Sequence, residues 1–403
     1  MAPPLALSDI EQARKRLSGV VLQTPLIRSA TFSAMTGGEV WIKQENLQKT
    51  GSYKIRGAYN RIANLPPETL RRGVVAASSG NHAQGVAYAA RLLSAPATIF
   101  MPRSTPLPKI EATRGYGAEV VLEGDVYDEA YAAARSFCER EGRTFVHPFE
   151  DPLVMAGQGT VGLEILDELP EFDVFVCPVG GGGLLAGTAT AIKAKRPGVR
   201  IVGVQPEGSN AMHLSFRRGA LTSIPSPMTI ADGVSVKRPG EATFAILRAL
   251  ADDVVTVSDA DIARAMMLYL ERAKMVVEAA GAASLAALLS GAVDVRGKRA
   301  VVLASGGNVD LNTVGKIIFQ GLLAEGRYAY LAAVLEDKPG QLERLLHVVA
   351  QEGANVISIN HDRIAPEVPA GCAMVELDLE TMGREHTARL RKAVAAARFR
   401  LVE

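Results

Sequence analysis

The sequence has 403 residues, of which 48% are hydrophobic, 22% charged and 5% aromatic, a composition typical of globular rather than disordered or fibrous proteins. Its 44 basic and 43 acidic side chains leave a net charge of +1, so no global attraction to nucleic acid or to an anionic membrane is indicated. A chain of this length predicts two or three domains, and its function must come from local sites.

Cysteine usage and the composition of the N-terminus indicate a reducing compartment. The three cysteines are too few for a disulfide framework at this size, and none forms a Cys-x-x-Cys pair; they are Cys138, Cys177 and Cys372. Residues 1–19 carry charges where a signal peptide needs an apolar core, and no later run reaches about 18 uninterrupted apolar residues. We therefore expect a cytoplasmic protein.

Short β-branched runs alternate with Ala-rich helical stretches between about residues 39 and 310. The runs are continuously apolar and read VVLEG, DVFVCPV, RIVGVQP, DVVTVS and RAVVLAS. Parallel strands that are buried by helices on both faces have this pattern. The sequence therefore predicts an α/β protein with an open, twisted sheet.

Lys54 lies in the segment ENLQKTGSYKIRGAYNRI, directly ahead of a helical stretch that begins near Ile55. At a helix start the positive end of the dipole disfavours an ammonium group and helps to supply the neutral amine that Schiff-base chemistry requires. Lys54 is thus a candidate nucleophile. Most lysines are solvated surface groups, however, and residue type alone leaves Lys43 and Lys49 as equal candidates.

The segment SSGNHAQG at residues 78–85 follows the apolar run VVAA and precedes a helix. Its backbone N–H groups point ahead of the helix, and its Ser, Gly and Asn residues can bind a carboxylate or a ring hydroxyl. An ordinary Asn-containing helix cap has the same pattern, so both interpretations stay open. We assign no catalytic role to His82, since a lone His near an apolar helix is usually structural.

The stretch around this segment reads β-loop-α-β-α-β by itself. It predicts a small α/β domain at residues 55–149, inserted into a large domain made of residues 1–54 and 150–322. A cleft between two such domains is a usual place for a small-molecule site.

The glycine run CPVGGGGLLAG, residues 177–187, again follows a buried strand and precedes a helix. Consecutive glycines permit positive φ angles and close approach of the main chain, so their amides can wrap a phosphate. An alternative is a dinucleotide site, because Gly181, Gly183 and Ala186 fit a loose G-x-G-x-x-A pattern and Glu207 follows the next strand. That alternative leaves Lys54 and Asn81 without a role.

The strand in VVLASGGNVD ends at Ser305, with two glycines after it. A hydroxyl at the carboxyl end of a strand lies where open α/β sheets bind ligands. The same residues also fit a simple turn.

The composition changes past Leu322, where LAEGRYAY predicts a hinge into a separate module at residues 328–403. The segments that follow read strand YAYLAAVLE, turn DKPG, helix QLERLLHVVAQEG, strand NVISINHDRI, strand CAMVELDLE, helix REHTARLRKAVAAAR and strand FRLVE. This βαββαβ order predicts a ferredoxin-like sandwich. The module carries no obvious nucleophile or base constellation.

Four segments occur in a fixed order along the chain: SYKIRGA, SSGNHAQGVAYAA, PVGGGGLLAG and ASGGNVD. As an ordered set they resemble the fold-type II pyridoxal-phosphate enzymes, and among these the threonine dehydratases (threonine ammonia-lyases). The resemblance covers about residues 5–322, and the C-terminal module resembles an ACT domain, a regulatory unit that binds amino acids. The implied fold is that of tryptophan synthase β: two α/β open-sheet domains, here followed by the ACT-like module.

The resemblance implies a role for each matching residue. Lys54 resembles the lysine that forms a Schiff base with pyridoxal 5′-phosphate (PLP), Asn81 the side chain beside the 3-hydroxyl of that cofactor, and Ser305 the group that faces its pyridine nitrogen. The implied phosphate-binding residues are Gly180, Gly181, Gly182, Gly183 and Leu184. The implied substrate-carboxylate loop is Ser78, Ser79, Gly80, Asn81 and His82.

The implied activity is β-elimination: L-threonine yields 2-oxobutanoate and ammonia, and L-serine yields pyruvate. Lys54 is expected to take the proton from Cα while hydroxide leaves from the β-carbon. The neutral hydroxyl of Ser305, unlike a carboxylate, does not demand a protonated pyridine, which favours prompt elimination over transamination.

Ser79 departs from the threonine dehydratase pattern. Many threonine dehydratases have Ala at this place, whereas serine racemases have a serine that acts on the opposite face of the substrate. Serine racemase or serine dehydratase activity therefore stays open. Racemases of this group also hold a divalent metal near the following strand, but VGVQPEGSNAMH offers Gln205 and His213 there, with Glu207 displaced. We expect no metal.

In the C-terminal module, Gly340 is expected to let main-chain amides reach a ligand carboxylate, and Asn355 to bind the ligand's amine. The resemblance implies isoleucine or valine as effector, a place in isoleucine biosynthesis, and a homodimer or homotetramer. Two other interpretations stay open: a module that only dimerises, and an amino-acid-sensing protein whose dehydratase core is inactive.

Overall fold

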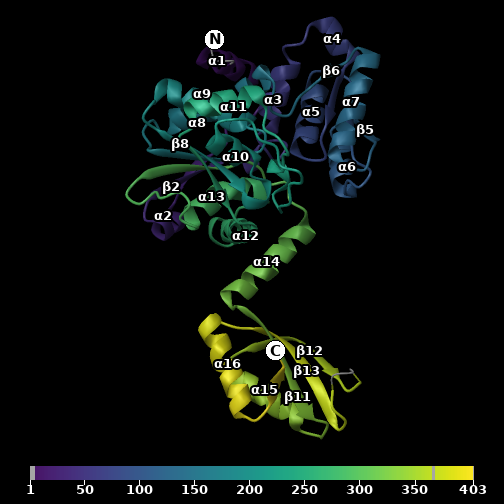
Figure 1. Cartoon of the computed structure of the whole chain (residues 1–403), viewed down its shortest axis with the longest axis vertical. Coiled ribbons are helices and arrows are strands. Elements are labelled where there is room, and N and C mark those ends of the chain that lie inside the picture. Colours follow the sequence, from purple (N-terminus) through teal and green to yellow (C-terminus); the bar gives the residue numbers. More distant parts are fainter. Residues whose placement is uncertain (1–4, 365–367, 403) are drawn as a thin grey trace. The chain divides into compact units, whose positions relative to one another are not determined.

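The computed structural model describes residues 5–364 and 368–402 of the chain. By the contacts between residues, the chain divides after Val309 into two compact units, Met1–Val309 and Asp310–Glu403 (Figure 1). Each unit has its own sheets and its own core of buried apolar side chains.

The larger unit contains a six-stranded sheet with the order β1-β2-β10-β7-β8-β9. Its strands are parallel except β1, which pairs antiparallel with β2 at one edge. The bounds are β1 (Leu26–Ser29), β2 (Glu39–Gln44), β7 (Val174–Pro178), β8 (Arg200–Pro206), β9 (Asp253–Val257) and β10 (Arg299–Ala304). The central strands are buried along their whole length, as expected for a sheet that is covered on both faces.

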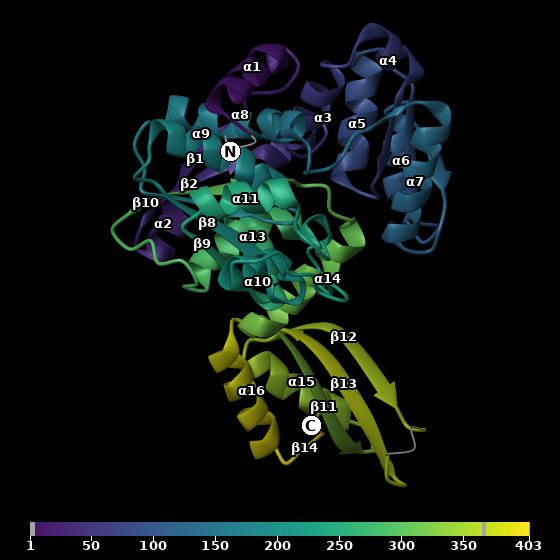
Figure 2. The same ribbon diagram turned by 45° about the horizontal axis from the view of Figure 1, so that its top comes forward.

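Helices cover both faces of this sheet (Figure 2). One layer consists of α8 and α9 with α1 and α11, and the other is formed by α13 with α12 and α2, while α10 packs beside β9. The bounds are α1 (Leu7–Leu17), α2 (Ala30–Thr36), α8 (Pro152–Glu168), α9 (Gly183–Lys195), α10 (Ala211–Arg218), α11 (Glu241–Leu250), α12 (Asp259–Leu268) and α13 (Ala279–Leu289). Short turns of helix are η1 (Glu45–Leu47), η2 (Glu207–Ser209), η3 (Asp232–Val234) and the π-helical η4 (Tyr269–Ala273).

A second, four-stranded parallel sheet has the order β5-β4-β3-β6. The strands are β3 (Val74–Ala77), β4 (Ala97–Met101), β5 (Glu119–Leu122) and β6 (Thr144–Phe145), and the helices are α3 (Lys54–Ile62), α4 (Pro67–Arg72), α5 (Asn81–Leu92), α6 (Leu107–Gly115) and α7 (Tyr127–Glu141). Val74 and Ala76 face the core formed with α3 and α5, whereas Val75 and Ala77 face α7. This alternation is the two-residue period of a strand between two layers of helix.

The C-terminal unit has the ferredoxin-like βαββαβ order that the sequence predicts, preceded by α14 (Leu311–Glu325). Its antiparallel sheet has the order β12-β13-β11-β14, and α15 and α16 pack their apolar faces on one side of it. The bounds are β11 (Tyr328–Glu336), α15 (Gln341–Gln351), β12 (Asn355–Asp362), β13 (Cys372–Glu380), α16 (Arg384–Ala396) and β14 (Arg400–Val402).

The predicted fold class is therefore confirmed: two α/β sheets and a ferredoxin-like module. The compact units divide between residues 309 and 310, and the hinge predicted past Leu322 begins in the last turn of α14. The division of the first 322 residues into a large and a small domain stays a prediction. Within the described ranges, no helix is both long and apolar enough to cross a membrane.

Candidate active site

The four segments singled out in the sequence all follow the carboxyl end of a strand. Ser305 comes directly after β10, the glycine run after β7, and the 78–81 loop after β3, while Lys54 lies beyond β2 and η1. Strands β2, β10 and β7 are parallel neighbours, so their carboxyl ends lie at one edge of the sheet. Parallel packing thus gathers segments that are far apart in sequence.

Lys54 is the first residue of α3, as predicted, and its side chain is partly exposed. Its Nζ donates to the carbonyl oxygen of Pro148 at 3.3 Å. Burial of the amine lowers the pKa of Lys54 to about 8, although the nearby Glu278 acts to raise it. About a tenth of the amine is therefore neutral at pH 7, far more than for a lysine with its ordinary pKa, and the neutral form is what a nucleophile or a base requires.

The other two candidate lysines do not share this environment. Lys43 is fully buried, and its Nζ contacts carboxylate oxygens of Glu164 and Glu168 at 2.9 and 3.0 Å. Lys49 is exposed, as an ordinary surface lysine is. The structure therefore separates Lys54 from its competitors on environment, which residue type alone did not.

Main-chain contacts tie the Ser305 loop to the Lys54 loop. The amide of Tyr53 donates to Ser305 O at 3.2 Å, the amide of Gly307 donates to Gly51 O at 2.8 Å, and Ser52 forms a β-bridge with Gly306. Ser305 itself is 3% exposed. The strand end that carries Ser305 and the helix start that carries Lys54 therefore form one continuous framework.

Asn81, the first residue of α5, links that framework to α13. Its Nδ2 donates to Glu278 Oε1 at 2.7 Å, and its Oδ1 accepts from Asn308 Nδ2 at 2.8 Å. Burial raises the pKa of Glu278 to about 7, against the lowering effect of the Asn81 hydrogen bond. Asn81 is thus the middle member of a hydrogen-bonded series of side chains, Asn308–Asn81–Glu278, and does not act as a simple helix cap.

The glycine run forms the loop between β7 and α9. Only Gly182 has a clearly positive φ, at +100°; the other glycines matter for close approach, since a Cβ on Gly181 would lie 2.4 Å from the ring of Phe149. The carbonyl of Gly181 accepts from Thr243 Oγ1 at 2.6 Å and from the amide of Gly240 at 3.4 Å. No hydrogen bond described outside the helices and strands uses an amide of residues 180–183 as donor. These amides, at the N-terminus of a 13-residue helix, suit an anion.

The predicted substrate loop has open space in front of it. A Cβ on Gly80 would meet no atom within 4 Å, and both Ser78 and Ser79 are partly exposed. The amide of Gly80 donates to Ser78 Oγ at 3.2 Å. Next to them, His82 is buried, and its Nε2 lies 2.8 Å from Val146 O. Burial lowers the pKa of His82 to about 3, so this imidazole is neutral.

The segment His147–Glu150 completes the surroundings of Lys54. Pro148 O accepts from Lys54, the ring of Phe149 contacts the glycine run, and Glu150 Oε1 accepts from the first amides of α11. Sequence reasoning missed these residues together with Glu278 and Asn308. Asn308 lay inside the ASGGNVD motif, and Glu278 directly precedes an apolar helix, a place that by itself indicates only interaction with the helix dipole.

The residues discussed for a metal serve other contacts. Gln205 Oε1 accepts from the amide of His213 at 2.8 Å, and His213 Nδ1 lies 2.6 Å from Val254 O. The described part of the chain contains no cluster of three His, Cys, Asp or Glu side chains arranged to hold a metal ion. The expectation that no metal binds stays a prediction.

The two predicted effector residues lie at opposite ends of one helix. Gly340 precedes α15 and has φ +86°, and Asn355 begins β12, after the helix has ended. An α-helix of 11 residues is about 16 Å long, so one small amino acid does not reach both residues of the same copy. The effector assignment stays a prediction, now with this constraint.

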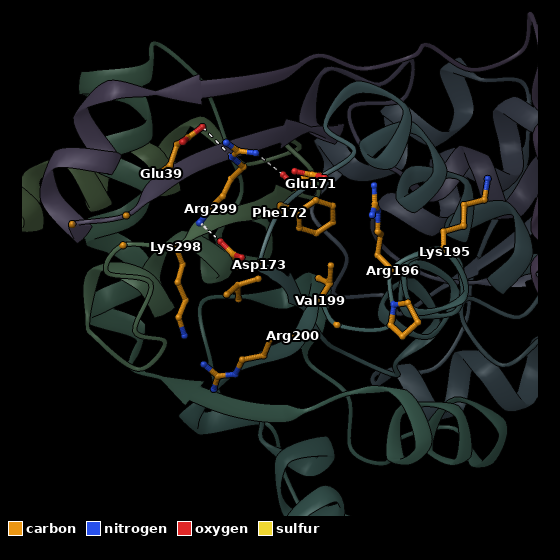
Figure 3. Close-up of a pocket in the computed structure, with 16 residues that line it drawn as sticks. Glu39, Glu171, Phe172, Asp173, Lys195, Arg196, Val199, Arg200, Lys298 and Arg299 are labelled. Carbon is orange, nitrogen blue, oxygen red and sulfur yellow. Dashed lines mark hydrogen bonds and ion pairs between the residues drawn. The ribbon is translucent and has the colours of Figure 1, made fainter.

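A cavity of about 1140 Å³ lies elsewhere in the larger unit (Figure 3). Its lining includes Glu39, Val174, Arg200 and Arg299, which are the first residues of β2, β7, β8 and β10. The cavity is therefore at the amino ends of these strands, the opposite edge from Ser305 and the glycine run. None of the residues singled out in the sequence lines it.

Comparison with known proteins defines the class of enzyme. Residues 17–306 match the family model described as "Pyridoxal-phosphate dependent enzyme", and the chain belongs to that family. An L-threonine ammonia-lyase of Thermotoga maritima is 50% identical to this chain over 97% of this chain and 98% of its own. The predicted cofactor, PLP, is thereby confirmed, while the role of the glycine run in binding it stays a prediction.

Two solved structures resemble this chain over most of its length. The processed form of threonine deaminase isoform 2 from Solanum lycopersicum has a TM-score of 0.76 at 38% identity and covers 79% of this chain and 87% of that one. Maize serine racemase has a TM-score of 0.75 at 37% identity and covers 79% of this chain and 98% of that one.

Proposed function

We propose that this chain is an L-threonine ammonia-lyase, which converts L-threonine to 2-oxobutanoate and ammonia and also acts on L-serine. The observation that carries the proposal is Lys54: a partly exposed amine with a lowered pKa, which donates to Pro148 O and follows a main-chain contact with the Ser305 loop. The similarity to the Thermotoga maritima enzyme extends over nearly the whole chain and supports the choice of substrate.

The residues around Lys54 fit PLP. The Lys54 amine matches the cofactor's aldehyde, the amides of residues 180–184 match its phosphate, and Asn81 and Ser305 offer hydrogen bonds to the ring oxygen and the ring nitrogen. The free amides of the glycine run and the open space at Gly80 support this fit. When bound, PLP supplies an electron sink for the carbanion formed at Cα.

The chain's own groups then bind the substrate and move its protons. Amides of the Ser78–His82 loop hold the substrate carboxylate at the start of α5, where the helix dipole favours an anion. The Lys54 amine takes the Cα proton, which its low pKa permits near neutral pH. His82 stays neutral and supports the loop through Val146 O. The Ser305 hydroxyl does not impose a positive charge on the ring, which favours elimination over transamination.

The test is incubation of the purified chain with L-threonine and, separately, L-serine, while keto-acid formation is followed. We expect 2-oxobutanoate from L-threonine and pyruvate from L-serine. A colourless protein without the absorption band of a Schiff base, or one that releases no keto acid, would favour the sensor with an inactive core.

A second candidate activity, serine racemisation, rests on Ser79. This side chain is partly exposed in the substrate loop, where a group facing the substrate from the side opposite Lys54 would be needed to return a proton. The similarity to maize serine racemase is lower than that to the ammonia-lyase, so we propose racemisation only as a side activity. Chiral analysis of the L-serine reaction tests it. We expect the parent chain to form D-serine and the Ser79→Ala variant to form none.

We propose that the C-terminal unit is an ACT domain that senses isoleucine or valine. The unit has the ferredoxin-like order and the positive-φ Gly340 turn, and the match to maize serine racemase covers 98% of that protein but only 79% of this chain. Because Gly340 and Asn355 lie at opposite ends of α15, a shared ligand needs two copies of the unit. This supports a homodimer or homotetramer.

Free Cys138, Cys177 and Cys372 support a cytoplasmic location.

A further inference from the structure

Glu278 has the position of a helix cap but does not act as one. It is the N-cap residue of α13, yet its side chain makes no capping hydrogen bond to that helix. Its carboxylate instead accepts from Asn81 Nδ2 at 2.7 Å. The contact joins residues that are 197 positions apart in the sequence, and therefore needs an explanation other than local helix stability.

The main chain of the Ser305 loop is shaped to permit this contact. The amide of Glu278 donates to Gly306 O at 2.9 Å, which holds the start of α13 against the loop. A Cβ on Gly306 would lie 2.4 Å from Glu278 Oε1 and 3.2 Å from Asn81 Nδ2. The absence of a side chain at residue 306 therefore leaves room for the carboxylate and the carboxamide to meet.

The other end of the Asn81 carboxamide is fixed independently. Asn308 Nδ2 donates to the main-chain oxygen of Thr50 at 2.7 Å, and a carbonyl oxygen can only accept. The Asn308 amide nitrogen is thereby identified, and its second hydrogen goes to Asn81 Oδ1 at 2.8 Å. The oxygen of Asn81 thus faces Asn308 and its nitrogen faces Glu278, with no freedom to exchange the two.

We propose that Glu278 and Asn308 are positioning residues that hold the Asn81 carboxamide in one orientation, with its nitrogen available to donate to the cofactor ring. One hydrogen of Asn81 Nδ2 goes to Glu278, and the second remains for the ring oxygen. Without either partner, the amide would have to be ordered at the moment of binding, at a cost in affinity. The inference rests on the proposed contact between Asn81 and PLP.

The test measures the PLP dissociation constant of the full-length chain and the absorption band of its bound cofactor. Asn81→Ala and Glu278→Ala are each expected to weaken PLP binding by about tenfold and to shift the band, since each removes a hydrogen bond to a charged or ordered group. Glu278→Gln keeps an oxygen that accepts from Asn81, and should stay within about threefold of the parent. Asn308→Asp cannot donate to Thr50 O or Asn81 Oδ1, and should behave like Glu278→Ala.

The double variant Asn81→Ala/Glu278→Ala decides whether Glu278 acts through Asn81. If it does, the double variant binds PLP no more weakly than the weaker-binding single variant. Multiplied losses, about a hundredfold in total, would overturn the proposal, because Glu278 would then act on its own. The matched control is Ser284→Ala, which removes a buried hydroxyl of the same helix that has no hydrogen-bond partner among the described residues, and should leave affinity and band unchanged.

Two further outcomes separate this inference from the proposed function. Parental affinity and an unshifted band in Asn81→Ala would refute the assignment of Asn81, and this inference with it. A loss in Asn81→Ala with parental behaviour in both Glu278→Ala and Asn308→Asp would refute the positioning role alone. Asn308 is exposed, so its substitution is compatible with folding even if that of Glu278 is not.

Discussion

Lys54 and Arg56 lie two residues apart on the first turn of α3, yet their surroundings differ completely. Arg56 is fully buried, and it donates to both oxygens of Glu45 at 2.7 and 2.8 Å and to both oxygens of Glu164 at 2.6 and 3.0 Å. Among the described residues, the Lys54 amine has one hydrogen bond, to the main-chain oxygen of Pro148, and its Nζ lies 5.2 Å from the centroid of the Tyr53 ring.

The pKa values follow from this difference in partners. Burial acts to lower the pKa of Arg56, but the two carboxylates outweigh it and raise the pKa above its ordinary value. For Lys54 burial wins, because Glu278 compensates only in part. One helix therefore carries a permanent cation that joins η1, α3 and α8, and an amine that is free to exchange protons. Pairing with carboxylates keeps Arg56 charged as a structural residue, and the lack of such a pair leaves Lys54 able to react as an amine.

Replacing Lys54 is expected to have the largest effect on activity. Lys54→Ala removes the amine, so ammonia release from L-threonine should fall by on the order of a thousandfold or more. Folding should be retained, since the side chain contributes only one neutral-acceptor hydrogen bond. The measurements are keto-acid assay, thermal unfolding, and borohydride trapping of the cofactor followed by peptide mapping. Lys49→Ala, an exposed neighbour, is the control. Ammonia release at the parental rate would show that the nucleophile is another residue.

Replacing Arg56 is expected to act on stability instead. Arg56→Met roughly keeps the volume, but it leaves the buried Glu45 carboxylate without its cation and Glu164 paired only with Lys43, which should cost about 3–5 kcal/mol of unfolding free energy. Arg14→Ala, which breaks the exposed pair with Asp167, should cost less than about 1 kcal/mol. Denaturant unfolding measures both. Equal losses in the two variants would mean that the buried network does not anchor α3.

The sequence predicted the parts of the site that follow from local order. Each of the four motifs lies between a buried strand and a helix or loop, and parallel strands bring such places to one edge of the sheet. The place of Lys54 at a helix start made it a candidate, but did not by itself separate it from the neighbouring lysines. The βαββαβ order of the C-terminal unit was equally readable, because its strands and helices alternate with clear periodicity.

The partners that tune these residues were not predictable, because they come from distant segments. Glu164 is 108 positions from Arg56, and Glu278 is 197 positions from Asn81. A single sequence does not reveal such pairs, and so it left Lys43, Lys49 and Lys54 equivalent. The same limit affected the effector site, where Gly340 and Asn355 were expected to bind one ligand although α15 separates them.

The pH dependence of cofactor binding tests whether Lys54, unlike Arg56, loses its charge near neutral pH. Attack on the aldehyde of PLP requires the neutral amine of Lys54, whose pKa is lowered from 10.5 to about 8. The rate at which PLP recombines with the cofactor-free chain should therefore rise about tenfold per pH unit below pH 8 and level off above it. A lysine paired like Arg56 would still be charged there, and the rate would keep rising toward pH 10.

The neighbouring imidazoles do not obscure this profile, because burial lowers the pKa of His82 to about 3 and of His147 to about 4. Glu278, with a pKa of about 7, does titrate in the range, and its carboxylate raises the pKa of Lys54. Glu278→Gln removes that charge, so the break in the profile should move below pH 8, whereas Ser284→Ala should leave it in place. If the pH at which the rate levels off instead moved upward in Glu278→Gln, the Glu278 carboxylate would be lowering the pKa of Lys54. Burial would then not be the cause of the low pKa that distinguishes Lys54 from Arg56.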